Sequence, residues 1–149
     1  MYVQLPLYML HQLEEHRGDA FRRFVNERMA GGRDALTRRA TFVINSAGVW
    51  GVNLVALWLA YEVDLAFGLI AVYLTATNAI VHIAGAVALR AYNPGLITAV
   101  VLFVPAATWG TIEVSDAADA GAGYQLLAIG LAVGLHAAII AYLRGRVRG

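Results

Sequence analysis

Four groups able to bind a metal ion or carry a proton lie within six residues, in the run His11-Gln-Leu-Glu14-Glu15-His16. On a helix, His11 and Glu15 are one turn apart on the same face, with Glu14 beside them. The apolar run Leu5 to Leu10 directly precedes this group. Ionisable groups in a membrane are costly unless they have partners or a function, so this run is the strongest functional signal in the chain.

The composition is that of an integral membrane protein. The chain has 149 residues, which suits a single domain (1–149), and 60% of them are hydrophobic while 14% are charged. A soluble domain has about a quarter charged residues. There is no cysteine, which excludes disulfides, thiolate metal sites and cysteine nucleophiles.

Four apolar stretches reach the length of about 20 helical residues that crosses a bilayer. They are residues 40–61, 65–89, 94–112 and 123–143. Short connections join antiparallel neighbours, so we expect an all-α membrane protein with a compact bundle of four transmembrane helices. Residues 7–29, which include the HxxEE pattern, are interpreted as an N-terminal helix that is partly inserted and continues as an amphipathic surface helix. A fifth span is the alternative.

The basic residues predict the orientation. All eleven are arginine, and they fall in residues 17–39, at Arg90 and in the C-terminal tail from Arg144. Short loops rich in arginine stay in the cytoplasm, so the 17–39 loop and the C-terminus are predicted to be cytoplasmic. Glu62, Asp64 and the acidic 113–122 loop then fall on the opposite side.

Two further histidines lie at matching depths. His82 and His136 each precede an arginine, Arg90 or Arg144, by eight residues, which places both about 12 Å inside the cytoplasmic end of a helix. Asn78 is one turn deeper than His82 on the same face. We hypothesise that these side chains meet the HxxEE run in the cytoplasmic half of the bundle.

Imidazoles and carboxylates together suit Zn, Fe or Mn. We therefore predict a divalent transition metal held by His11, Glu15, His82 and His136, with Glu14 as general base or bridging ligand. Asn78 is assigned to the catalytic group, either orienting a histidine or cross-linking helices.

Simpler interpretations stand beside this one. Residues 14–16 would then be headgroup-level charges paired with Arg17 or Arg22, and each intramembrane histidine would form an interhelical hydrogen bond. Gly130-x-x-x-Gly134 is a close-packing motif that leaves a homodimer open.

Three motifs in order carry a family resemblance: His11-x-x-Glu14-Glu15, Asn78-Ala-Ile-Val-His82, and Tyr92-Asn-Pro-Gly-Leu-Ile-Thr98. Together they resemble the HXXEE-motif membrane proteins, which are small prokaryotic integral membrane proteins without an assigned general function. The resemblance implies a prokaryotic cytoplasmic (inner) membrane and a role for His11, Glu14, Glu15, Asn78 and His82. Independently, Pro94 as a first helical residue with Asn93 before it predicts a helix start near the acidic run.

Three classes of function follow. The first is a metal-dependent membrane enzyme acting on a hydrophobic or lipid-like small molecule; a metal-free variant would use Glu14 or Glu15 as a buried acid in an isoprenoid isomerase or cyclase. The second is a small proton-coupled transporter. The third is an accessory subunit. The expected partners are membrane lipids and a hydrophobic substrate, and nothing indicates nucleic acid.

Overall fold

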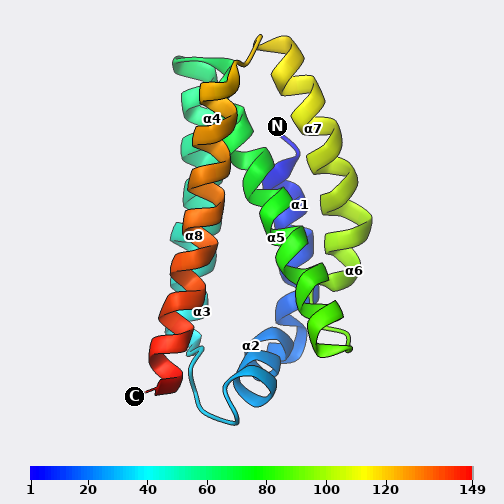
Figure 1. Ribbon diagram of the computed structural model, residues 1–149, viewed down its shortest axis with the longest axis vertical. Helices are drawn as coiled ribbons and strands as arrows, with labels where there is room; N and C mark the ends of the chain where they lie inside the picture. Colours follow the sequence, from blue (N-terminus) through cyan, green and yellow to red (C-terminus); the bar gives the residue numbers. More distant parts are fainter. Residues whose placement is uncertain (149) are drawn as a thin grey trace.

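The protein is a bundle of helices (Figure 1). The computed structural model describes residues 1–148 and contains no strand within them. Four helical segments are long and apolar enough to cross a membrane: Arg38–Glu62, Leu65–Leu89, Leu96–Ala117 and Ala122–Arg148. The predicted all-α membrane bundle is thereby confirmed.

Each segment lies over one of the predicted stretches, and most extend beyond it. The predicted stretches end where polar residues begin, but helical backbone continues through some of these polar residues: the third helix begins at Leu96 and runs to Ala117, and the fourth is helical as far as Arg148. In order, the elements are α3 (Arg38–Val43), π-helical turns at Ile44–Gly51, α4 (Val52–Glu62), a 3-10 turn at Leu65–Phe67, α5 (Gly68–Leu89), α6 (Leu96–Thr98), π-helical turns at Ala99–Phe103, α7 (Val104–Ala117) and α8 (Ala122–Arg148).

The helix α5 is the centre of the bundle. In its most apolar window 56% of the residues are buried inside the protein, against 17% for the α3–α4 segment and 11% for α8, which therefore present most of their surface to lipid. On α8, a Cβ added to Gly130 or Gly134 would meet nothing within 4 Å. This motif packs against no other part of the described chain, and the homodimer stays a prediction.

The N-terminal helix α1 (Gln4–His16) lies within the bundle, against α5 and the α6–α7 segment (Figure 1). Its buried face is polar and consists of Gln4, Tyr8, His11, Gln12 and Glu15, while Met9, Leu10 and Leu13 are exposed. A helix in lipid turns its apolar side outward, so its polar groups must find partners inside the protein. We predicted that this helix is partly inserted into the membrane. A helix that only capped the cytoplasmic leaflet would lie across the end of the bundle, whereas α1 lies among the membrane-spanning helices.

The single helix expected over residues 7–29 is wrong, because the chain turns after His16. Gly18 and Asp19 adopt left-handed backbone angles, with φ of 61° and 63°. Glycine enters this region at no cost and aspartate tolerates it, so the helix breaks here although the apolar periodicity continues. The element α2 (Ala20–Phe24) and the π-helical turns Val25–Met29 then cross the end of the bundle.

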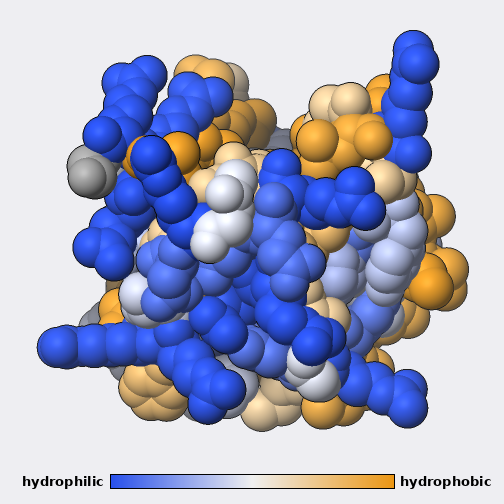
Figure 2. Space-filling view, turned by 90° about the horizontal axis from the view of Figure 1, so that it is seen from below, coloured by the Kyte–Doolittle hydropathy of each residue, from blue (hydrophilic) through white to orange (hydrophobic). Residues whose placement is uncertain are grey.

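All the arginines gather at this end, which we call the arginine-rich end: they lie in residues 17–39, in the 90–95 loop and at the C-terminus of α8. Seen from that side, hydrophilic side chains cover the surface and long ones project around its rim (Figure 2). Arg22 on α2 forms two ion pairs here. One, with Asp34 at 3.0 Å, holds the 30–37 loop against α2, and the other, with Asp19 at 2.6 Å, lies within the preceding turn. The cytoplasmic orientation of this end stays a prediction, which rests on its arginine content.

Candidate metal centre

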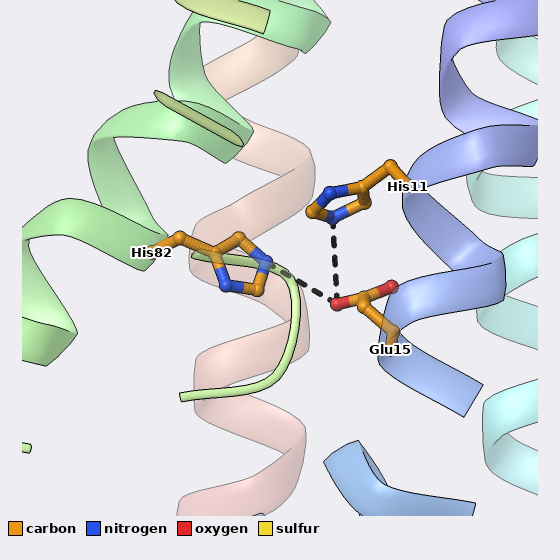
Figure 3. Close-up of side chains that lie close together, drawn as sticks. All are labelled: His11, Glu15 and His82. Atoms are coloured by element: carbon orange, nitrogen blue, oxygen red, sulfur yellow. Dashed lines mark ion pairs between the residues drawn. The ribbon is translucent and has the colours of Figure 1, made fainter. Parts of the chain in front are cut away.

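Three buried side chains converge between α1 and α5 (Figure 3). Glu15 Oε1 lies 3.2 Å from Nε2 of His82 and 3.6 Å from Nε2 of His11. Among residues 1–148, these three form a group in which one ligand atom from each lies within 4.8 Å of the others. We call them the His/Glu cluster, and they could hold a metal ion.

The hydrogen bonds around His11 fix which of its ring nitrogens carries a proton. Nδ1 lies 2.8 Å from the Thr98 hydroxyl. The single hydroxyl proton of Thr98 is already donated to the Glu14 carboxylate at 2.6 Å or to the Gly95 carbonyl at 3.2 Å. Thr98 must therefore accept from His11, so Nδ1 carries the proton and Nε2 of the neutral ring is left with a lone pair.

Asn93 makes the same assignment for His82. The Asn93 amide donates from Nδ2 to the His82 backbone carbonyl at 2.9 Å, which fixes the orientation of the amide. Its Oδ1 then faces His82 Nδ1 at 2.7 Å and accepts the proton there. Neutral His82, like neutral His11, thus presents an unprotonated Nε2 to Glu15.

The His/Glu cluster therefore brings together hydrogen-bond acceptors. In the neutral tautomers, two imidazole lone pairs and a carboxylate face one another without a donor, and His11 Nε2 has no hydrogen-bond partner within the described chain. Buried acceptors that face one another repel unless a proton or a cation lies between them. Histidines that bind metals commonly show this pattern, with the second ring nitrogen donating to a fixed acceptor.

The rings are also held by packing. The Phe103 ring centroid lies 4.4 Å from that of His11, and the Phe21 centroid lies 5.7 Å from that of His82. Such contacts restrict the rotamers of both histidines and so hold the geometry of the cluster in advance of binding.

Gly95 closes the cluster from the third side. It precedes α6 with φ of 99°, in the region that favours glycine. A Cβ added here would lie 2.6 Å from His82 Cε1, 2.8 Å from His11 Cε1 and 3.0 Å from Glu15 Cγ. The backbone of the turn is therefore in direct contact with all three residues, and no larger side chain fits.

Glu14 has a different position from the one expected of a base or bridging ligand. Its carboxylate accepts hydrogen bonds from the Ile97 and Thr98 backbone amides, the Thr98 hydroxyl and the Tyr92 hydroxyl. Partial burial, and then the hydrogen bond to Glu14, raise the pKa of Tyr92 to about 12, so this donor keeps its proton at neutral pH. Glu14 joins α1 to the first turn of α6, where free amides and the helix dipole favour an anion.

The remaining predicted residues lie nearby but outside the cluster. His136 Nδ1 faces the Ala132 carbonyl of its own helix at 2.8 Å, so the structure does not bring this histidine among the three converging ligands. Asn78 has a buried Oδ1 without a partner in the described chain.

His16 lies 2.6 Å from Asn45 Nδ2 and 3.9 Å from Glu15, and Arg22 pairs with aspartates rather than with residues 14–16.

A cavity of about 320 Å³ adjoins the cluster. Glu15 and His82 line it, as do Asn78 and His136, and most of the remaining wall is apolar. Ligand sites in proteins commonly combine such apolar walls with a few polar groups. His136 and Asn78 thus line a cavity of the kind that binds ligands, next to the His/Glu cluster.

The fold and the cluster define this protein as a helical membrane protein with a buried His/Glu group that opens on an apolar cavity. Its family follows from comparison with family models. The model described as "protein of unknown function with HXXEE motif" matches residues 2–110, so the chain belongs to the HXXEE family. No curated protein and no solved structure matches the chain.

The roles of Asn93, Gly95 and Thr98 were missed by the sequence analysis. Asn93 was interpreted as part of a helix start with Pro94 first in the helix, but the helix begins at Leu96 and the Asn93 side chain binds His82 instead. The available signal was the Tyr92–Thr98 motif itself, since all three residues belong to it.

We expect Thr98→Val to weaken metal binding about 10- to 100-fold, the usual loss when a partner of a metal-binding histidine is removed. Valine keeps the shape of threonine but cannot accept the His11 proton. Thr98→Ser retains the hydroxyl and is the matched control. Titration against a chelator of known affinity measures the effect, and equal affinities for the two variants would contradict the tautomer assignment.

Proposed function

We propose that this protein is a metal-dependent membrane enzyme that acts on a hydrophobic or lipid-like small molecule. His11, Glu15 and His82 would bind one divalent transition ion, with Zn, Fe and Mn suited to nitrogen and oxygen ligands. Three protein ligands leave coordination positions free, as catalytic sites require. An ion there would supply Lewis acidity towards water or a substrate oxygen.

The observation that supports this proposal is the convergence of three buried acceptors, which are the Glu15 carboxylate and the Nε2 atoms of two histidines that carry their protons on Nδ1. The Nδ1 protons point to Thr98 and Asn93, and so each Nε2 is available as a ligand. Binding a cation removes the repulsion among these groups. Without a cation, their burial among apolar side chains makes this repulsion stronger.

The position of the cavity supports a hydrophobic substrate. It lies beside Glu15 and His82 at the level of the membrane-spanning helices, and its walls are largely apolar. A molecule dissolved in the bilayer could reach the cluster without crossing an aqueous phase.

Metal analysis of the purified wild-type protein tests the proposal. We expect about one equivalent of a transition metal, and a thermal unfolding midpoint that falls on chelation and recovers when the ion returns, because a ligand that binds only the folded state stabilises it. A folded protein that contains no metal, and whose unfolding midpoint does not respond to added Zn, Fe or Mn, would overturn it. In that case the cluster would hold a proton, as in the acid–base variant of the enzyme.

A proton-coupled carrier is the second candidate, and the polar face of α1 favours it. Gln4 and Asn53 are fully buried beyond the cluster, towards the end of the bundle opposite the arginines, and each has a carboxamide oxygen without a partner in the described chain. Polar groups thus continue past the cluster on α1 and on the neighbouring α4, as a pathway would need. Proton flux in proteoliposomes, absent in Glu15→Gln, would support this candidate over the enzyme.

A further inference from the structure

The packing of α5 against α8 loosens towards the arginine-rich end. The last buried residues are His82 on α5 and Ala132 on α8, and beyond them neither helix has a fully buried residue. Figure 1 shows the two helices close together at the opposite end and diverging towards α2. The cavity lies in the region where they diverge.

Several residues that line the cavity are also exposed on the outside of the bundle. On the two diverging helices they include Val81 and Leu89 of α5 and Ile140 of α8, each about two-fifths exposed; Met29, after α2, also lines the cavity and is 60% exposed. A side chain that borders a cavity and the surface at once marks an opening. This opening is apolar and lies within the segments that span the membrane, so it faces lipid tails.

Arginines stand at the end of this opening. Arg90 directly follows Leu89, and Arg144 is one turn beyond Ile140 on the same face of α8. Neither α5 nor α8 contains an acidic residue, and neither arginine forms an ion pair within the described chain. The opening therefore combines an apolar passage with two uncompensated positive charges at headgroup level.

We propose that the cavity takes up a single-chain anionic amphiphile from the bilayer, through the opening between α5 and α8. Arg90 at the end of α5 and Arg144 on α8, on the two sides of the opening, attract its anionic head group, and its chain enters the cavity. A volume of 320 Å³ lies near the lower limit of ligand pockets, which suits one chain rather than a two-chain phospholipid.

This binding mode also determines which part of the molecule meets the His/Glu cluster. His82 lies eight helical residues from Arg90, about 12 Å along the axis. A head group held at Arg90 therefore cannot reach Glu15 or His82, and the chain lies beside them instead. A reaction at the His/Glu cluster would therefore take place on the chain of the bound molecule; this conclusion rests on the proposed function, whereas the binding mode itself requires no metal.

Photo-crosslinking tests the proposal with the full-length protein in phosphatidylcholine nanodiscs. Three probes share one chain with a diazirine at its middle and differ in the head group, which is a carboxylate, a phosphate or a neutral alcohol. We expect both anionic probes, or one of them, to label the cavity segments 74–89 and 135–143, and the alcohol to label them weakly. The better of the carboxylate and phosphate probes identifies the head group.

Two sets of variants separate the opening from general contact with lipid. Ile140→Trp narrows the opening and should abolish labelling of the cavity segments, whereas Leu127→Trp, on the same helix with similar exposure, should not. Arg90→Gln and Arg144→Gln should each reduce labelling by the anionic probes roughly fivefold, as expected for losing one cation near the membrane surface, without changing the alcohol.

The proposal is overturned if the tryptophan variants behave alike, if the alcohol labels the cavity as well as the anions do, or if crosslinks are confined to the outer faces of the helices. Metal content, measured on the same samples, keeps the two proposals apart. Cavity labelling in a metal-free protein would leave the binding mode standing and remove the metal enzyme. A metal-loaded protein whose cavity is not labelled would do the reverse.

Discussion

Replacing His82 by alanine is expected to lower the affinity for the metal more than about 100-fold, because removal of an outer partner of a ligand already costs about 10- to 100-fold. Within residues 1–148, His82 supplies one of the three ligand atoms that converge in the His/Glu cluster. The measurement is a competition titration with a chelator, followed by metal analysis after dialysis. Glu15→Gln keeps the shape of the side chain, removes the negative charge and should cause a loss of similar size.

His136→Ala is the matched control for this prediction. His136 was predicted as a fourth ligand, but its ring bonds its own helix and lies outside the cluster. We expect its removal to leave the metal content unchanged, although it alters the cavity wall. A loss of metal in His136→Ala equal to that in His82→Ala would show that the ion lies elsewhere in the cavity.

Replacing Gly95 by alanine is expected to destabilise the protein more than the same replacement at Gly31 or Gly134. Two costs add: about 1–3 kcal/mol for a non-glycine residue in the left-handed region, and about 1–3 kcal/mol for overpacking. The added Cβ would meet His82, His11 and Glu15 at 3.0 Å or less, so metal binding should fall as well. Thermal unfolding in detergent or nanodiscs, with and without metal, measures both effects.

Two other glycines separate the two costs. Gly31 has φ of 60° but nothing within 4 Å of an added Cβ, so Gly31→Ala reports backbone strain alone. Gly134 is helical with nothing near it, so Gly134→Ala should have little effect. If Gly95→Ala destabilised the protein no more than Gly31→Ala and left metal binding intact, the turn would not press on the cluster as described.

The sequence by itself determined the membrane class, the four spanning helices and the common end of the arginines. These properties depend on composition and on the number of consecutive apolar residues, because a bilayer requires roughly 20 of them per helix. The HxxEE spacing likewise put His11 and Glu15 on one face of a helix, and the depth arithmetic put His82 at a suitable level. Each of these inferences uses distances along one helix, which the sequence supplies directly.

Tertiary structure decided which of the residues that lie at the same depth in the membrane come into contact. His82 and His136 have the same offset from an arginine, yet the rotation of α5 turns His82 to Glu15 while α8 keeps His136 at the cavity wall. The adjacent carboxylates divide in the same way: Glu15 enters the cluster and Glu14 anchors α6, because neighbours on a helix point about 100° apart. The turn at Gly95 and the amide of Asn93 complete the cluster through contacts between distant segments. Depth follows from counting residues, whereas the facing of one helix towards another depends on how the whole bundle packs.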